Sequence, residues 1–375
     1  MKALFLVFHG LSPTNGISKK IQAQVKALND CGVNTNLCYY DIDTCGNRMW
    51  RLDNGTIVER LGNGLTGKLK KRFCYQNLFQ YIIINQISFI YIRSDHNANP
   101  FTIHFVKKLR KAGITTVMEI PTYPYDQEYI TFESKCHLFI DKLFRKSLAA
   151  QVSRIITFSD KKEIFGQRTI QISNGIDFDS IPLKKTHPPR NDIHLIGVAE
   201  IHYWHGYDRL VAGMADYYRT YTDDQRKVYF HLVGDFSGER ERNEILPLIE
   251  NNKLEKYVIL HGPLYGDDLD KLFDLVDIGI GSLARHRSNV NYIKTLKNRE
   301  YAARGIPFIY SEIDDDFEMM LYVMKVSADE TQINIDRLIL FYDQLTFTPQ
   351  EIRESTQNLA WEKQIQKTLD KLFND

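Results

Sequence analysis

The chain has 375 residues, of which 43% are hydrophobic and 25% are charged, and these values are ordinary for a soluble globular protein. Because this length exceeds the size at which one hydrophobic core usually stops growing, it predicts two domains. The formal net charge of +1 gives no broad electrostatic drive toward nucleic acid or a membrane, and we expect no nucleic-acid partner.

The cysteines and the apolar runs bear on the compartment. The five cysteines are odd in number and include no C-x-x-C pair, which argues against a zinc site or a disulfide framework and fits a reduced cytosol. The apolar run within residues 1–10 is too short for a signal sequence and reads as a first strand, and no run approaches the length that spans a membrane. We therefore expect a cytoplasmic protein.

The first half of the chain alternates between strand-like and helix-like patterns. The predicted strands are Ala3–Phe8, Val33–Tyr40, Phe89–Arg93, Thr115–Ile120, Arg154–Phe158 and Thr169–Ile172. The predicted helices are Ser18–Leu28, Leu69–Ile84, Pro100–Ala112 and Lys135–Ala150. Asn54-Gly55 lies between two short apolar segments and predicts a small hairpin inserted after the second strand.

A polar stretch with prolines and lysines, residues 180–192, is the best candidate for a linker. The alternation restarts after it. The predicted strands are His194–Val198, Val228–Val233, Val258–Leu260, Ile278–Gly281, Pro307–Tyr310 and Tyr322–Val326. The predicted helices are Tyr207–Tyr221, Arg240–Asn251, Asp267–Leu275 and Tyr292–Ala303, with two more helical segments at about 329–345 and 349–374.

Strand–helix alternation on both sides of one linker predicts an α/β fold with two doubly wound parallel sheets. We place the first domain at residues 1–185 and the second at residues 192–350. Ligands bind such sheets at the carboxyl ends of the strands, so we expect the site in a cleft between the two domains.

The segment 297–309 is the most informative part of the sequence. It predicts a helix that ends at Gly305, in the left-handed conformation of a C-cap, and then a buried strand after Pro307. Lys297 and Glu300 share one face at the entrance of this helix. A cation and a carboxylate so placed could hold a phosphate and a ribose hydroxyl of one nucleotide; a surface ion pair without a function is the alternative.

Six segments, spread along nearly the whole chain, form an ordered set. They are Gly10–Gly16 after the first strand, Ser173–Asp177 at the close of the first domain, Gly197–Leu210 and His231–Asp235 early in the second domain, Leu296–Pro307 in the helix of Lys297, and Ala360–Glu362 at the start of the last helix. In this order they resemble motifs of the retaining GT-B glycosyltransferases of the family-4 type, with Leu296–Pro307 carrying the second glutamate of an E-x7-E signature.

This resemblance implies two Rossmann-like domains that face each other across a cleft, with a C-terminal helix, residues 351–375, that crosses back to the first domain. It implies transfer, with retention, of a sugar from a nucleotide-sugar donor (UDP- or GDP-sugar) to a saccharide or lipid-linked saccharide acceptor, in surface polysaccharide or glycoconjugate synthesis. It implies no cofactor and no required metal. A nucleotide-sugar 2-epimerase of the same fold and a non-catalytic partner subunit remain alternatives.

The chain departs from the family pattern at positions that matter for the donor. The first glutamate of the E-x7-E signature falls on Tyr292, and the cations common after the first strand of the second domain correspond to Glu200 and His205. The resemblance implies that His205 and Lys297 replace these cations.

Three residues are candidate catalytic groups. Lys297 and His205 would stabilise the charge that grows on the leaving diphosphate; a solvated lysine and a structural histidine are the alternatives. Glu119, at the end of a predicted strand, would orient or deprotonate the acceptor hydroxyl, or else be a buried structural carboxylate.

Further candidates concern binding. Glu300 would accept hydrogen bonds from ribose hydroxyls, or form a salt bridge to Arg299 or Arg304. The N–H groups of residues 281–283 could bind the diphosphate, and so could one of the side chains in 285–287. The donor-binding candidates are Gly16, Trp204, Gly234, Leu264, Ser282, Leu283, Lys297 and Glu300. The acceptor-binding candidates are Arg93, Asp95, Tyr123 and Tyr125.

Two acidic motifs and one basic motif complete the analysis. Asp41-Ile42-Asp43 matches a manganese-binding pattern that is common by chance, and residues 314–316 read as a solvated helix start, so we predict no metal at either. Residues 68–73 are basic and precede an apolar run. They could contact an anionic membrane, or form an ordinary helix with a charged face.

Overall fold

The structure is a computed structural model that describes residues 1–12, 15–129, 131–188 and 190–373. The chain forms two compact units, which we describe separately. Unit 1 is Met1–Gly175 together with Trp361–Asp375, and unit 2 is Ile176–Ala360.

The described residues of the segment predicted as a linker, 180–188 and 190–192, belong to unit 2, and Lys184 and Lys185 are hydrogen-bonded to other parts of that unit. The backbone N–H of Lys184 donates to Arg304 O at 2.9 Å, and the backbone N–H of Lys185 donates to the Asp274 carboxylate at 2.9 Å. The described units therefore divide after Gly175, before the boundary expected from composition.

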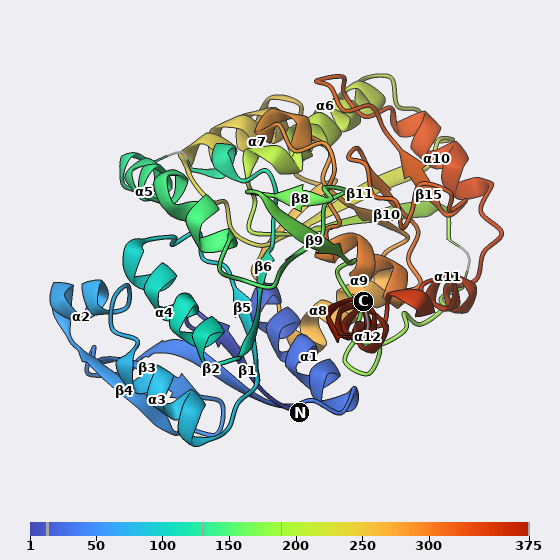
Figure 1. Cartoon of the computed structure of the whole chain (residues 1–375). Coiled ribbons are helices and arrows are strands. Elements are labelled where there is room, and N and C mark those ends of the chain that lie inside the picture. Colours follow the sequence, from blue (N-terminus) through green and yellow to red (C-terminus); the bar gives the residue numbers. More distant parts are fainter. Residues whose placement is uncertain (13–14, 130, 189, 374–375) are drawn as a thin grey trace. The chain divides into compact units, whose positions relative to one another are not determined.

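Unit 1 is built on a nine-stranded sheet with the order β4-β3-β2-β1-β5-β6-β7-β9-β8 (Figure 1). The strands are β1 (Lys2–Val7), β2 (Asn34–Ile42), β3 (Arg48–Leu52), β4 (Ile57–Gly62), β5 (Phe89–Arg93), β6 (Thr115–Ile120), β7 (Arg154–Thr157), β8 (Glu163–Ile164) and β9 (Gln167–Gln171). The central strands pair in parallel, whereas β3, β4 and β8 pair antiparallel. The hairpin predicted at Asn54-Gly55 is confirmed as the β3–β4 turn.

Helices cover both faces of this sheet because alternate residues of the central strands point to opposite sides. Leu4 and Leu6 belong to a core with α3, α4 and α5, whereas Phe5 and Val7 belong to a core with α1 and α12. The helices are α1 (Gly16–Asp30), α2 (Gly64–Lys70), α3 (Gln76–Ile84), α4 (Pro100–Lys111), α5 (Phe132–Ala149) and α12 (Trp361–Phe373). The single helix predicted over 69–84 is wrong: α2 and α3 are separate helices.

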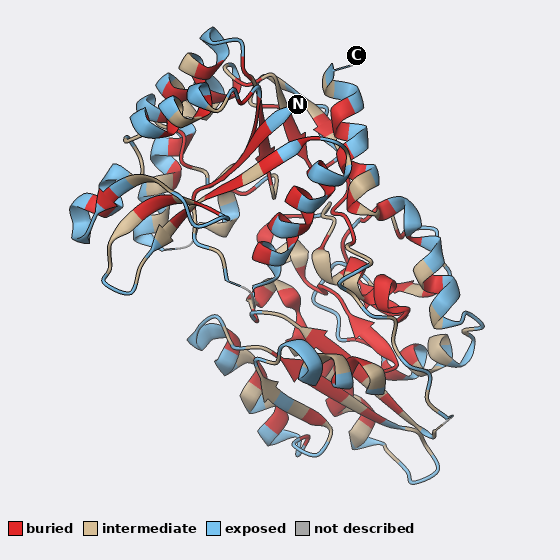
Figure 2. Cartoon of the chain, turned by 90° about the horizontal axis from the view of Figure 1, so that it is seen from below, coloured by how far each residue is buried: buried red, intermediate tan, exposed pale blue. Residues whose placement is uncertain are grey.

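Unit 2 is built on a parallel six-stranded sheet with the order β12-β11-β10-β13-β14-β15. The strands are β10 (Asp192–Val198), β11 (Lys227–Val233), β12 (Val258–Gly262), β13 (Ile278–Ile280), β14 (Phe308–Tyr310) and β15 (Val323–Lys325). Figure 2 shows that the strands of both sheets are largely buried, as expected for doubly wound sheets. This confirms the predicted α/β fold.

The helices of unit 2 pack on both faces of its sheet. They are α6 (Tyr207–Arg219), α7 (Glu239–Asn251), α8 (Gly266–Leu275), α9 (Leu296–Arg304), α10 (Ile335–Asp343) and α11 (Pro349–Ser355). The predicted C-cap at Gly305 is confirmed: its φ is +74°, and a Cβ there would lie 2.3 Å from Pro349 O.

The predicted final helix, 349–374, is interrupted. α11 ends at Ser355 and lies in unit 2, where the Arg353 guanidinium donates to Ile181 O at 2.8 Å. The chain re-enters unit 1 at Trp361, where α12 begins. Among the described residues, no helix is both long and apolar enough to cross a membrane.

Candidate functional site

The candidate site of unit 2 lies where the strand order reverses. β10 has β11 on one side and β13 on the other, and the carboxyl ends beside such a reversal are where open α/β sheets bind ligands. The segments that follow β10 and β13 are hydrogen-bonded to each other. Leu283 N–H donates to His205 O at 2.9 Å, and Ala284 N–H donates to Trp204 O at 3.3 Å.

The segment after β10 is held by a close turn at Gly206. The φ of Gly206 is +65°, and a Cβ there would lie 2.9 Å from the backbone N of Ala284. Trp204 stacks on His202 with 4.2 Å between ring centroids, and the Arg285 guanidinium lies 5.2 Å from the Trp204 ring. Trp204 therefore packs within its own loop in unit 2.

His205 is buried and carries its proton on Nε2. Its Nδ1 accepts a hydrogen bond from His202 N–H at 3.0 Å, which leaves Nε2 as the protonated nitrogen of a neutral ring. Burial, with Lys297 and Arg285 nearby, holds the pKa of His205 well below its usual range. Burial therefore favours a neutral ring, whose Nε2–H is a hydrogen-bond donor, and the expected role of His205 in place of a cation stays a prediction.

Lys297 stands in the first turn of α9 and is half-buried. Its ammonium donates to the Tyr207 hydroxyl at 3.2 Å, and no carboxylate of the described residues forms an ion pair with it. Burial and the neighbouring Arg285 lower the pKa of Lys297 to about 7, although Glu312 acts in the opposite direction. The Thr295 side chain makes no cap hydrogen bond, so α9 presents uncapped N–H groups beside this lysine.

Glu300 forms the salt bridge that was the alternative to ribose binding. Its Oε1 accepts from Arg304 Nε at 3.1 Å, and Arg304 also pairs with Asp270 at 2.7 Å. The two residues that the sequence places together, Lys297 and Glu300, are not paired with each other in the structure. The second carboxylate oxygen of Glu300 has no partner among the described residues.

Two of the N–H groups expected to bind a diphosphate are already occupied. Gly281 N–H donates to Ile309 O at 2.8 Å, and Leu283 N–H donates to His205 O. This part of the prediction is wrong, because residues 281–283 hold β14 and the β10 loop in place. Ser282 remains a candidate for donor binding, since its buried Oγ has no hydrogen-bond partner within the described ranges.

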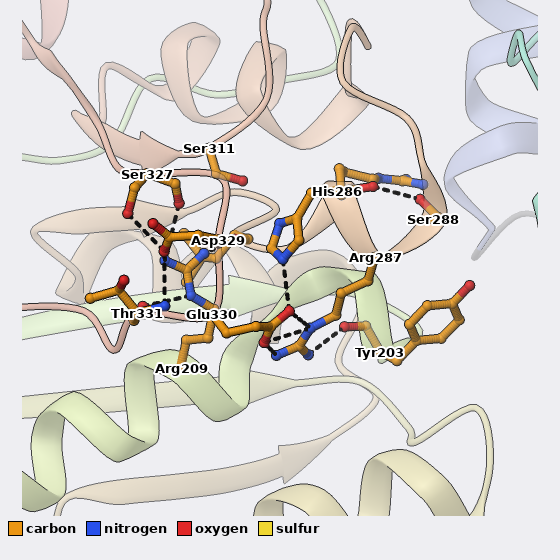
Figure 3. Close-up of polar contacts among 12 residues, drawn as sticks. Tyr203, Arg209, His286, Arg287, Ser288, Ser311, Ser327, Asp329, Glu330 and Thr331 are labelled. Atoms are coloured by element: carbon orange, nitrogen blue, oxygen red, sulfur yellow. Dashed lines mark hydrogen bonds and ion pairs between the residues drawn. The ribbon is translucent and has the colours of Figure 1, made fainter.

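Of the cations in 285–287, two are used inside unit 2 (Figure 3). Arg287 Nε donates to Glu330 at 3.0 Å, and Arg287 Nη1 donates to Tyr203 O at 2.9 Å. His286 lies 2.7 Å from the same Glu330 carboxylate. This network fixes the loop that carries Arg285.

Gly234 and Leu264 have structural explanations. Gly234 has a φ of +118°, and a Cβ there would lie 1.7 Å from Ala199 O, so only glycine fits between the ends of β11 and β10. Leu264 is partly buried against the core that contains α8 and α9.

The acidic run after β14, residues 314–316, was predicted to be a solvated helix start, and this prediction is wrong. Asp314 is fully buried and forms an ion pair with Arg299, and Arg299 also pairs with Asp316. These carboxylates are drawn into the interior because the buried guanidinium of Arg299, on α9, requires a carboxylate partner. No group of three potential metal ligands occurs among the described residues.

In unit 1, Glu119 is the centre of a buried charge network. It is fully buried at the end of β6, pairs with Arg93, and lies 3.2 Å from the Lys20 ammonium. It also accepts from Gln24 at 2.6 Å and from the Tyr91 hydroxyl at 2.7 Å. Burial alone would raise the pKa of Glu119, but Lys20 and Arg93 lower it to about 2. These contacts favour the structural carboxylate over a base.

The acceptor candidates are not gathered into one cluster. Asp95 is exposed and pairs with Lys71 at 3.3 Å, whereas Arg93 is committed to Glu119. Tyr125 is buried and donates to Asp141 at 2.6 Å, and Tyr123 packs edge-on against Phe165.

Gly16 begins α1, where Asn15 caps the helix. A cavity of about 180 Å³ lies beside it and is lined by residues after β1, among them His9, Gly10 and Asn15. A Cβ at Gly16 would meet no atom of the described residues within 4 Å.

Comparisons with known proteins concern the whole chain. No protein-family model and no curated protein matches the sequence. Sucrose-phosphate synthase from Thermosynechococcus elongatus is similar in structure at 15% identity, with a TM-score of 0.68 over 100% of both chains. Anabaena HepE in complex with UDP has 17% identity and a TM-score of 0.62, covering 99% of this chain and 100% of the other. TarM has 12% identity and a TM-score of 0.63, covering 100% and 99%. The fold of this chain is GT-B.

One side chain near the carboxyl ends of the strands in unit 2 was missed by the sequence analysis. Glu312 follows β14, is 2% exposed, and neither of its carboxylate oxygens has a hydrogen-bond partner among the described residues. Burial raises the pKa of Glu312 to about 7, while Arg285 and Lys297 oppose the rise. Thr295 Oγ1, just before α9, and Asn298 Oδ1, on α9, are also buried and have no hydrogen-bond partner in the described part of the chain. The rule that strand ends carry function could have found Glu312, since it lies just past a predicted strand.

Proposed function

We propose that the chain is a retaining glycosyltransferase that moves a sugar from a nucleotide-sugar donor to a saccharide or lipid-linked saccharide acceptor. We place its work in cytoplasmic synthesis of surface polysaccharide or a glycoconjugate. The observation that carries the proposal is Lys297. This lysine has no ion-pair partner among the residues that the structure describes, and it stands in the first turn of an uncapped helix, among buried polar atoms at the sheet reversal of unit 2. The structures of HepE with UDP and with UDP-glucose support the choice of donor class.

The proposed chemistry is stabilisation of the leaving nucleoside diphosphate. Lys297 would place its ammonium against the phosphate oxygens, and the first N–H groups of α9 would point at the same charge. His205 would add a neutral N–H donor from Nε2. These donors are held before the reaction and gain strength as negative charge grows on the leaving group, which is the source of rate enhancement in such sites. The proposal includes no metal and no cofactor.

The remaining polar atoms suit a ligand with hydroxyl groups. Glu312, Asn298 and Ser282 offer oxygen atoms that the protein leaves unbonded in the interior, and an unbonded buried oxygen costs about 1–3 kcal/mol. Hydroxyl groups of the donor would satisfy them. Glu300 keeps one carboxylate oxygen for the ribose while the other holds Arg304.

The proposal assigns no base to the protein. Glu119 is fully buried and paired with two cations, so it would accept a proton poorly near neutral pH. The departing phosphate would take the acceptor proton instead, as the resemblance to retaining GT-B enzymes implies. Glu119 would act by positioning Arg93 at the end of β5.

The test is a screen of nucleotide-sugars followed by a turnover assay. A donor at about a hundredfold excess over its Kd stabilises a protein by about 2.7 kcal/mol, so thermal shifts with UDP-, GDP- and other nucleotide-sugars should reveal it. The selected donor is then incubated with oligosaccharide and lipid-linked acceptors, and the anomeric configuration of the product is read by NMR. Acceptor-dependent transfer with retention supports the proposal.

Two results would overturn it. Conversion of the donor without any acceptor would identify an epimerase. The absence of a thermal shift with every nucleotide-sugar would favour the non-catalytic subunit.

A further inference from the structure

Helices α2, α4 and α5 of unit 1 carry an unusual concentration of positive charge. Together they have Lys or Arg at ten positions and Asp or Glu at only two, whereas the whole chain has a net charge of +1. One of the two acids, Asp141, is buried and bonded to Tyr125. The other, Glu133, is exposed and pairs with Lys68 of α2 at 3.4 Å.

The outer face of α5 is apolar along its length. Phe132, Phe139 and Leu143 are 85%, 64% and 60% exposed, and their spacing, with the exposed Cys136, places them on one stripe of the helix. Ile140 lies beside this stripe and is also exposed. The opposite face of α5 packs into unit 1 through Leu138, Asp141 and Leu148. An apolar stripe that faces solvent on a helix already packed on its other side needs an explanation.

Lysines accompany the stripe. Lys135, Lys142 and Lys146 are exposed and follow one another at helical spacing along one flank of α5. Lys142 is paired with Asp126, whereas Lys135 and Lys146 form no ion pair with a carboxylate of the described residues. A row of long cations beside exposed aromatic and aliphatic groups is the composition of a helix that lies in a lipid interface.

Two neighbouring helices of unit 1, α2 and α4, also carry exposed apolar side chains (Figure 1 shows the helices). Leu65 and Leu69 of α2 are 78% and 59% exposed, and α2 is joined to α5 by the Lys68–Glu133 pair. Phe73, just after α2, packs against Phe101 of α4 with 5.7 Å between ring centroids, and both are exposed. We call the exposed apolar residues of α2, the Phe73–Phe101 pair and α5, with their lysines, the α2/α5 face.

We propose that the α2/α5 face docks on the surface of an anionic lipid bilayer. The apolar side chains would enter the boundary between headgroups and acyl chains, and the lysines would contact anionic headgroups. Charge complementarity favours an anionic bilayer as the partner. The two carboxylates of these helices are bonded to Tyr125 and paired with Lys68, so almost no free negative charge would oppose an anionic surface. The inference is independent of the donor site in unit 2, and it widens the basic segment 68–73 of the sequence into a surface centred on α5.

The experiment is flotation of the full chain with lipid vesicles. Vesicles of phosphatidylcholine alone are compared with vesicles that also contain phosphatidylglycerol, at low and high salt. We expect binding only to the anionic vesicles and a loss of binding at high salt, because salt screens the lysines. Phe139→Ser with Leu143→Ser, and separately Lys135→Glu with Lys146→Glu, should each weaken binding about tenfold or more.

A matched control removes exposed apolar groups elsewhere. Met319 and Leu321 of unit 2 are 88% and 77% exposed, and Met319→Ser with Leu321→Ser should leave vesicle binding unchanged. All substituted side chains are exposed, so thermal midpoints should stay close to that of the parent chain and serve as a check of folding. Equal binding to neutral and anionic vesicles, or equal loss in the control, would overturn the proposal. So would concentration-dependent dimerisation, measured by analytical ultracentrifugation, that only the α5 variants abolish.

Discussion

The Lys297 ammonium donates a hydrogen bond to the Tyr207 hydroxyl at 3.2 Å, so this cation has a neutral partner near the carboxyl ends of the strands in unit 2. Tyr207 is itself buried at the start of α6. A cation that donates to a neutral hydroxyl, and to no carboxylate of the described residues, is available to an anionic ligand without first breaking an ion pair. This relationship is the physical basis of the proposed donor site.

The first prediction is a pH dependence of donor binding. The pKa of Lys297 is lowered to about 7 in the free protein, so the ammonium is lost as pH rises through that value. Glu312, with a pKa of about 7, gains its negative charge over the same interval, and both changes disfavour an anion. We expect the affinity for a nucleotide-sugar to fall between pH 6 and pH 8. A nucleotide-sugar is the right probe because its diphosphate diester does not titrate near neutral pH.

Calorimetry in buffers of different ionisation enthalpy checks the sign. Binding at pH 7 should be accompanied by proton uptake, since the ligand favours the charged lysine. Proton release, or an affinity that rises with pH, would contradict this account of Lys297.

A second prediction concerns Glu312→Gln. This change keeps the size of the side chain but removes its charge. It therefore separates the effect of the Glu312 charge on the diphosphate from the hydrogen bonds that Glu312 would accept from sugar hydroxyls. We expect free nucleoside diphosphate to bind as well as before or more tightly, because a carboxylate near Lys297 is gone. We expect the nucleotide-sugar to lose about tenfold in affinity, since an amide accepts hydroxyl hydrogen bonds with only one of its two polar atoms. Parallel titrations of the two ligands make the comparison, and an equal effect on both would remove Glu312 from the sugar site.

A third prediction concerns Glu119→Gln. The substitution leaves Lys20 and Arg93, both nearly buried, without their shared carboxylate. Breaking a buried pair in this way typically costs about 3–5 kcal/mol, so the urea midpoint should fall strongly. Asp95→Asn is the matched control, because Asp95 pairs with Lys71 at the surface and such pairs contribute about 0–1 kcal/mol. Loss of sugar transfer in a Glu119→Gln chain of unchanged stability would instead restore the catalytic role.

Local features of the fold could be predicted from the sequence, and pairings between distant residues could not. The Asn54-Gly55 turn and the Gly305 cap depend on the conformations that a few adjacent residues allow, so the pattern was sufficient. The partner of Glu300 was a choice among nearby cations, and packing of α9 against α8 decided for Arg304, which also meets Asp270.

The same contrast explains what was missed at the sites. Lys20 of α1 meets Glu119 of β6 only when the sheet is assembled, and no periodicity reports that contact. The N–H of Leu283 was expected to be available because the strand ends there, but the loop after β10 uses it. Glu312 lies just past a predicted strand, so the strand-end rule could have singled it out, but only the structure shows that its carboxylate is buried.

The central claim, that Lys297 binds the diphosphate of a nucleotide donor, is tested most directly by titration calorimetry. The ligands are the nucleoside diphosphate of the donor found by screening and the corresponding nucleoside. The proteins are the parent chain, Lys297→Gln, and Lys271→Gln as a control on the exposed face of α8. A hydrogen bond to a charged group contributes about 1.5–3 kcal/mol, so Lys297→Gln should weaken the diphosphate at least about tenfold. Nucleoside binding, and every affinity of the control, should stay unchanged. Equal weakening of diphosphate and nucleoside by Lys297→Gln, or no weakening of either, would contradict the account.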